Sequence, residues 1–133
     1  MTVMLDTNII ISAGVFGAGR LSELTLRIAD EFNLVLSGAI IKELWEVMER
    51  KFSQKKPALE RFLKRLSYEI SYTPTEIDTD IYPKIRDKKD YPILASAIIA
   101  DVDVFITGDG DFGSVDIERP EIMKISEFAE KYL

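Results

Sequence analysis

The sequence predicts a three-layer α/β/α sandwich, in which helices cover both faces of a mainly parallel central sheet. Short apolar segments of strand length alternate with longer segments of helical spacing over most of the 133 residues. Hydrophobic residues make up 47% of the chain and charged residues 30%, a balance typical of a globular protein. Because the length is near that of one domain and no linker stands out, we expect a single domain over residues 1–133.

Strands are predicted where short apolar runs stop at polar or glycine-containing turns. The first covers Thr2 to Leu5 and ends in a polar turn at residues 6–8, and a glycine-rich loop at residues 14–19 comes soon after. The other strands are expected at residues 34–36, 102–106 and 122–125.

Helices are predicted between these strands from the spacing of apolar side chains. One runs from about residue 21 to 32, and another follows Ser37, which can cap its N-terminus. Ser53 and Pro57 open a third, whose apolar residues fall at i, i+3, i+4 and i+7, namely Leu59, Phe62, Leu63 and Leu66. Residues 73–80 form a polar connection before a helix at residues 90–100, which has Pro92 in its first turn. Ser126 is expected to cap a C-terminal helix.

The chain contains neither cysteine nor histidine. This excludes Ser-His-Asp and Cys-His catalysis, zinc fingers, thiol redox chemistry and disulfide scaffolds. The first five residues carry no basic leader, and no apolar run approaches the ~20 residues that span a bilayer. We therefore expect a cytoplasmic protein with no membrane segment.

Charge is unevenly distributed along the chain, whose formal net charge is -6. Residues 50–65 carry seven bases and one acid, whereas the segments on either side are acidic. Two interpretations of this basic block remain open: the solvated face of a helix, or an electrostatic footprint for the phosphates of a nucleic acid.

Several carboxylates are predicted to converge at one edge of the sheet. Asp6 and Asp109 each follow a predicted strand, with Asp111 two residues on, and binding sites of such folds lie beyond the carboxyl ends of the strands. Glu43 and Asp90 lie on helices beside apolar stretches. Each acid alone has an ordinary structural explanation as a turn, cap or surface residue. Together they would repel one another unless cations neutralised them, and oxygen ligands suit Mg²⁺ or Mn²⁺. Phosphodiester hydrolysis is the natural reaction of such a site.

Four sequence elements in order resemble the PIN-domain nucleases, and within them the VapC-like toxins of toxin-antitoxin pairs. The elements are Met4-Leu5-Asp6-Thr7-Asn8, Ser37 with Glu43, Arg86-Asp87-Lys88-Lys89-Asp90 leading into Ile93-Leu94-Ala95, and Phe105-Ile106-Thr107-Gly108-Asp109-Gly110-Asp111-Phe112. The resemblance covers nearly the whole chain. One departure is Tyr91-Pro92, where many relatives carry a small polar residue at the first of these positions.

The resemblance implies a PIN fold and a metal-dependent ribonuclease that uses Mg²⁺ or Mn²⁺ on RNA. It assigns the metal-site positions to Asp6, Glu43, Asp90 and Asp109, an auxiliary acidic position to Asp111, and supporting polar positions to Asn8 and Thr107. Ser37 matches a further polar position, and Asp87 matches the first acid of the Arg-Asp-x-x-Asp segment. A small antitoxin partner and a homodimer are also implied.

Other functions fit the sequence less well. A phosphoacceptor receiver domain needs paired acids after the first strand, and a haloacid-type phosphatase needs Asp-x-Asp there, whereas this chain has Asp6-Thr7-Asn8. The glycines at positions 14, 17 and 19 lack the order of a dinucleotide-binding fingerprint. The alternative that stays open is a PIN-fold module that binds RNA or a protein without cleaving anything.

Overall fold

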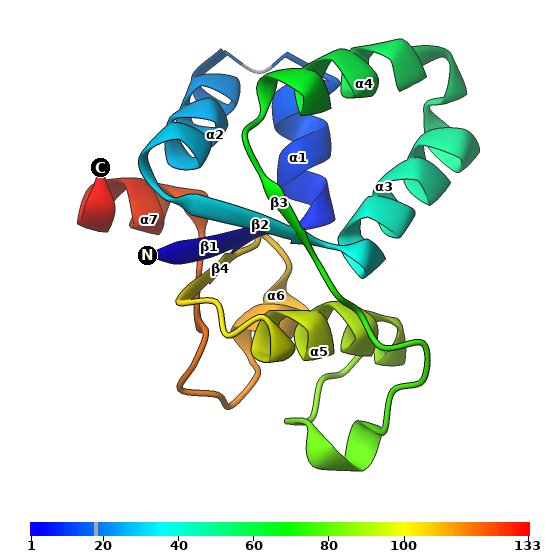
Figure 1. Cartoon of the computed structure of the whole chain (residues 1–133), viewed down its shortest axis with the longest axis vertical. Coiled ribbons are helices and arrows are strands. Elements are labelled where there is room, and N and C mark those ends of the chain that lie inside the picture. Colours follow the sequence, from blue (N-terminus) through cyan, green and yellow to red (C-terminus); the bar gives the residue numbers. More distant parts are fainter. Residues whose placement is uncertain (18) are drawn as a thin grey trace.

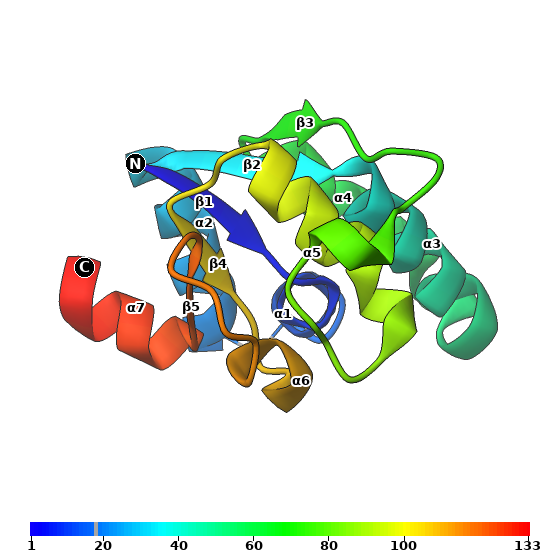
Figure 2. The same ribbon diagram turned by 90° about the horizontal axis from the view of Figure 1, so that it is seen from below.

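Five parallel strands form the central sheet of the computed structural model, which describes residues 1–17 and 19–133. The sheet order is β3-β2-β1-β4-β5, with β3 at one edge and β5 at the other (Figure 2). The strands are β1 (Thr2–Leu5), β2 (Asn33–Ser37), β3 (Glu69–Ser71), β4 (Val104–Ile106) and β5 (Glu121–Met123). In the register of the central strands, Met4 is paired with Val35 on one side and with Phe105 on the other.

Helices cover both faces of this sheet, which confirms the predicted three-layer architecture. The helices are α1 (Thr7–Gly14), α2 (Gly19–Glu31), α3 (Gly38–Lys51), α4 (Lys56–Arg65), α5 (Tyr91–Ile99), α6 (Gly110–Gly113) and α7 (Ile125–Tyr132). Figure 1 shows α1, α2 and α4 above the sheet and α5 and α6 below it. Because both faces are covered, Val3, Met4 and Leu5 of the central strand are fully buried.

Three sequence predictions about secondary structure were wrong. The polar turn expected at residues 6–8 is instead the start of the helix α1, which Asp6 caps by accepting a hydrogen bond from the backbone nitrogen of Thr7. The glycine-rich loop expected at residues 14–19 is present at residues 15–17, between α1 and α2, and its residue 18 lies outside the described residues. The strand β3 was not predicted, because it is short and its residues are exposed or half-buried. Ser126 does not cap the last helix, which begins one residue earlier at Ile125.

No single helix among residues 1–17 and 19–133 is long and apolar enough to cross a membrane. The pair α1 and α2, bent by 120°, passes that test only when the two helices are taken together.

Gly14 ends α1 at a close approach to α4. A Cβ atom at this position would lie 2.5 Å from Cγ and 2.9 Å from Cβ of Phe62, whose side chain is buried. We expect Gly14→Ala to lower the free energy of unfolding by about 1–3 kcal/mol, because overpacking against a buried ring outweighs the roughly 1 kcal/mol gained in helix propensity. Urea denaturation measures this. Gly113→Ala is the control, because its Cβ would meet nothing within 4 Å. A wild-type midpoint for Gly14→Ala would contradict the close contact.

Candidate metal centre

The candidate site lies where the connections of the sheet change direction. From β1 the chain proceeds to β2 and then β3 on one side, and it then crosses to β4 and β5 on the other side. Such a switch point between neighbouring strands leaves a crevice beyond their carboxyl ends. Asp6 follows β1 directly, and Thr107 follows β4 directly.

Asp6 is held in a fixed position by both of its carboxylate oxygens. Its Oδ1 accepts a hydrogen bond from the backbone nitrogen of Thr7 at 2.8 Å, and its Oδ2 accepts one from the hydroxyl of Thr107 at 2.7 Å. The residue is only 4% exposed. Each oxygen retains a lone pair, so the carboxylate can still bind a cation.

Thr107 joins Asp6 to the loop that follows β4. Its hydroxyl oxygen accepts a hydrogen bond from the backbone nitrogen of Asp109 at 3.0 Å while it donates to Asp6. The side chain of Asp109 then accepts from the backbone nitrogen of Asp111 at 2.8 Å and caps α6. This chain of hydrogen bonds fixes two of the predicted acids relative to each other across neighbouring strands.

Glu43 and Asp90 approach the same crevice from two helices. Glu43 lies half-buried in α3, and the charges of both Glu43 and Asp109 raise the pKa of Asp6. Asp90 precedes α5 in the N-cap position, yet its side chain makes no capping hydrogen bond. Capping therefore does not account for this half-buried carboxylate.

Burial and mutual repulsion raise the pKa values of two of these acids. Desolvation is the largest cause for Asp6, whose pKa rises to about 6 although hydrogen bonds from Thr107 and Thr7 act in the opposite direction. Desolvation also leads for Asp90, whose pKa rises to about 7 with contributions from the charges of Asp109, Asp87, Asp6 and Glu43. The four acids that the resemblance assigns to a metal site thus lie within electrostatic range of one another.

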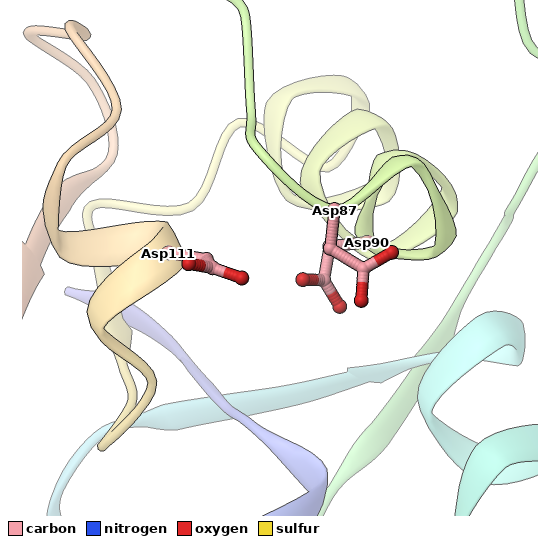
Figure 3. Close-up of side chains that lie close together, drawn as sticks. All are labelled: Asp87, Asp90 and Asp111. Atoms are coloured by element: carbon pink, nitrogen blue, oxygen red, sulfur yellow. The ribbon is translucent and has the colours of Figure 1, made fainter.

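Three aspartates form a tighter cluster, which shares Asp90 with the four acids above. Carboxylate oxygens of Asp87, Asp90 and Asp111 all lie within 4.8 Å of one another. Figure 3 shows Asp111 on α6 directed toward Asp87 and Asp90, which come from the segment leading into α5. Asp87 and Asp90 are three residues apart in a helical turn, a spacing that places both side chains on one face.

One cation is paired with this cluster in the part of the chain that the structure describes. The guanidinium Nε of Arg86 lies 2.9 Å from Oδ1 of Asp111, and the Arg86 side chain is 85% exposed. Nothing in the sequence indicates this ion pair, because it joins the segment before α5 to the helix α6, which are distant along the chain.

Two of the predicted polar residues, Asn8 and Ser37, make no hydrogen bond to these acids within residues 1–17 and 19–133. Asn8 is exposed in the first turn of α1, and among the described residues it makes no side-chain hydrogen bond. Ser37 is fully buried, and its hydroxyl accepts from the backbone nitrogen of Ile40 at 3.2 Å, as expected for the cap of α3. Capping is sufficient to explain Ser37.

The donor set fits a hard divalent cation. All of the converging side chains offer oxygen atoms, which Mg²⁺ and Mn²⁺ prefer, and such an ion would offset both the burial and the mutual repulsion that raise the pKa values of Asp6 and Asp90. The hydroxyl of Thr7, in a residue that is 1% exposed, has no hydrogen-bond partner among residues 1–17 and 19–133. A hydrated ion at Asp6 offers water molecules to such a group.

Comparisons with known proteins show the fold and the family of this chain. No curated protein sequence matches the chain. Among solved structures, it is similar to a chain of the crystal structure of VapBC2 from Rickettsia felis bound to a DNA fragment from their promoter. The TM-score is 0.68 and the identity 20%, and the similarity covers 93% of this chain and 98% of the other. Residues 2–111, which include every acid discussed above, match the PIN domain. The chain therefore belongs to the PIN domain family.

Proposed function

We propose that this protein is a metal-dependent ribonuclease that hydrolyses RNA phosphodiester bonds with Mg²⁺ or Mn²⁺. The observation that carries the proposal is the convergence of carboxylates from four separate elements at the switch point of the sheet. Asp6 follows β1, Asp109 follows β4, Glu43 lies in α3, and Asp90 precedes α5. A protein that only needed these acids for folding would gain nothing from crowding like charges, since crowding destabilises the folded state.

We assign the binding of the ion to Asp6, Glu43, Asp90 and Asp109, with Asp111 as an auxiliary ligand. A bound divalent ion would lower the pKa of a water molecule and stabilise the charge that grows on a phosphoryl group. The hydroxyl of Thr107 orients Asp6 by its 2.7 Å hydrogen bond and would hold that carboxylate in place when the ion binds. The carboxylate of Asp90 makes no capping hydrogen bond, so its oxygens would be available to the same ion. We retain Asn8 as a supporting residue, because it is exposed in the first turn of α1, two residues after Asp6.

We further propose that the ribonuclease is the toxin of a toxin-antitoxin pair, which binds a small antitoxin and forms a homodimer in the cytoplasm as one domain over residues 1–133. The similarity to a VapBC2 chain supports this assignment. A short neighbouring reading frame that encodes a DNA-binding protein, and whose product co-purifies with this chain, would separate a toxin from a housekeeping nuclease.

The test of the nuclease proposal uses end-labelled single-stranded RNA. We expect cleavage with Mg²⁺ or Mn²⁺ and none with EDTA, and we expect products with a phosphate at one new end and a hydroxyl at the other, because water is the nucleophile. Cyclic phosphate ends would indicate a contaminating nuclease of another mechanism. Binding of RNA without cleavage under every metal condition would favour the alternative, a PIN-fold module that recognises RNA or a protein partner.

A further inference from the structure

The basic block at residues 50–65 forms one region of the surface, made by the end of α3, the turn at Ser53–Lys55 and α4. Three of its seven bases are engaged with other side chains: Lys56 pairs with Glu49, Lys64 with Glu60, and Lys55 lies over the ring of Phe16. The other four are Arg50, Lys51, Arg61 and Arg65, which we call the free basic surface. All four are exposed, and none has an ion-pair partner within residues 1–17 and 19–133.

Arg61 and Arg65 differ from ordinary solvated bases because both line the same hollow. They lie four residues apart on α4, so their side chains leave the same face of the helix. The hollow has a volume of about 250 Å³, and its other walls include Gly14, Gly17 and Ser22. Two guanidinium groups beside small residues give phosphate oxygens close access to planar, bidentate donors.

The hollow lies at the opposite end of α1 from the acid crevice. Asp6 caps the N-terminus of α1, and Gly14 at its C-terminus packs against Phe62 of α4. Figure 1 shows α4 across the upper end of α1. A helix of eight residues is about 12 Å long, and a stacked nucleic-acid strand rises about 3.4 Å per nucleotide. The length of α1, which separates the acid crevice from the hollow, thus corresponds to about three or four nucleotides of a stacked strand.

We propose that Arg61 and Arg65 bind backbone phosphates of the same RNA strand that is cut at the acid crevice, about three or four nucleotides from the cleaved bond. This inference rests on the proposed ribonuclease function. A polyanion that approaches a chain of net charge -6 needs a positive anchor, and residues 50–65 provide one with seven bases and a single acid. Arg50 and Lys51 at the end of α3 extend the same surface.

The test measures RNA binding as a function of salt in the Asp6→Asn background, in which the RNA is expected to stay intact. Fluorescence anisotropy with a labelled 12-nucleotide RNA (about the length of the larger single-strand sites) gives the slope of log K against log salt. In the double variant Arg61→Gln and Arg65→Gln, we expect this negative slope to become shallower by about 1.4, because each phosphate contact on a single strand contributes about 0.7 to its magnitude. Affinity at low salt should fall about tenfold or more.

The control removes two positive charges elsewhere. Arg27→Gln with Lys131→Gln takes bases from α2 and α7 that are already paired with Glu31 and Glu121. This double variant should keep the wild-type slope, which separates a local phosphate contact from a change in net charge. An equal loss of slope in both double variants would overturn the proposal.

Two further outcomes distinguish this inference from the ribonuclease proposal. If the wild-type chain cleaves RNA but the arginine variant keeps its salt slope and instead loses binding to poly-glutamate, the free basic surface binds an acidic protein segment and the inference is wrong. If the slope falls as expected but no metal supports cleavage by the wild-type chain, the arginines do bind RNA and the ribonuclease proposal is wrong.

Discussion

Asp6→Asn is expected to lower kcat/KM for metal-dependent cleavage of single-stranded RNA by about 10²- to 10³-fold, the usual effect of losing a group that stabilises the transition state. Asparagine keeps the size of the side chain and can still accept the hydrogen bond from the backbone nitrogen of Thr7. Its amide can donate to the hydroxyl of Thr107 in place of accepting from it. The variant therefore loses the charge that holds a cation while the local geometry is retained. Initial rates on labelled RNA over a range of Mn²⁺ concentrations measure the effect.

This prediction separates a functional role from a structural one, because the same substitution should make the metal-free protein more stable at pH 7. Burial raises the pKa of Asp6 to about 6, so its charge opposes folding at neutral pH. Asp30→Asn on α2 is the matched control, because its carboxylate is exposed. The helix α2 leads into the amino end of β2, whereas the crevice lies beyond the carboxyl ends of the strands. Wild-type cleavage by Asp6→Asn would point to a contaminating nuclease or to a different site.

Much of this fold follows from local sequence patterns, and the exceptions have physical causes. The runs that became β1, β2 and β4 were predicted because both faces of a covered parallel sheet demand continuous apolar residues. The helix α1 was missed because its isoleucines favour strands. That helix forms because Asp6 caps it and because the protein core buries Ile10 and Ile11. Tertiary packing thus overrides the local preference.

The part of the candidate site that comes directly after strands could be predicted from the sequence. Asp6 and Asp109 could be placed because the carboxyl ends of neighbouring parallel strands meet at one edge of the sheet. Glu43 and Asp90 stood out as helical acids beside apolar stretches, and the family resemblance then assigned them to the same metal site as Asp6 and Asp109. Neither approach predicted the ion pair of Arg86 with Asp111, because that contact depends on how the segment before α5 packs toward α6.

The hydrogen bonds of Thr107 could not be predicted either, although the residue itself was assigned a supporting position. A threonine after a strand is a common turn residue, and nothing in the sequence shows which acid it will contact. In the structure its hydroxyl bridges Asp6 and the backbone of Asp109. The positions of these acids are therefore a property of the assembled sheet, whereas their chemical type is already evident in the sequence.

The stability of the metal-free protein is expected to fall as pH rises from 4 to 7. The pKa of Asp6 rises on folding from an ordinary value of 3.8 to about 6, so in this range the folded state binds more protons than the unfolded state. The stabilising effect of the protonated form is present below pH 4 and is lost as pH passes through 6. The change in the pKa of Asp6 between the unfolded and the folded state corresponds to about 3 kcal/mol of unfolding free energy. Asp90, whose pKa rises to about 7 and which is half-buried, extends the decline toward neutral pH.

Urea denaturation in EDTA at a series of pH values, followed by the fluorescence of Trp45, the single tryptophan, measures this decline. Mg²⁺ or Mn²⁺ should restore stability, and the gain should be larger at pH 7.5 than at pH 5, because the ion binds the ionised carboxylates of the folded state. Asp6→Asn should flatten much of the pH dependence and reduce the gain from metal, whereas Asp30→Asn should match the wild-type chain. An unfolding free energy that increases from pH 4 to pH 7 in EDTA would show that neither burial nor neighbouring acids disfavour the charged forms of Asp6 and Asp90, and the proposed metal centre would lose its physical basis.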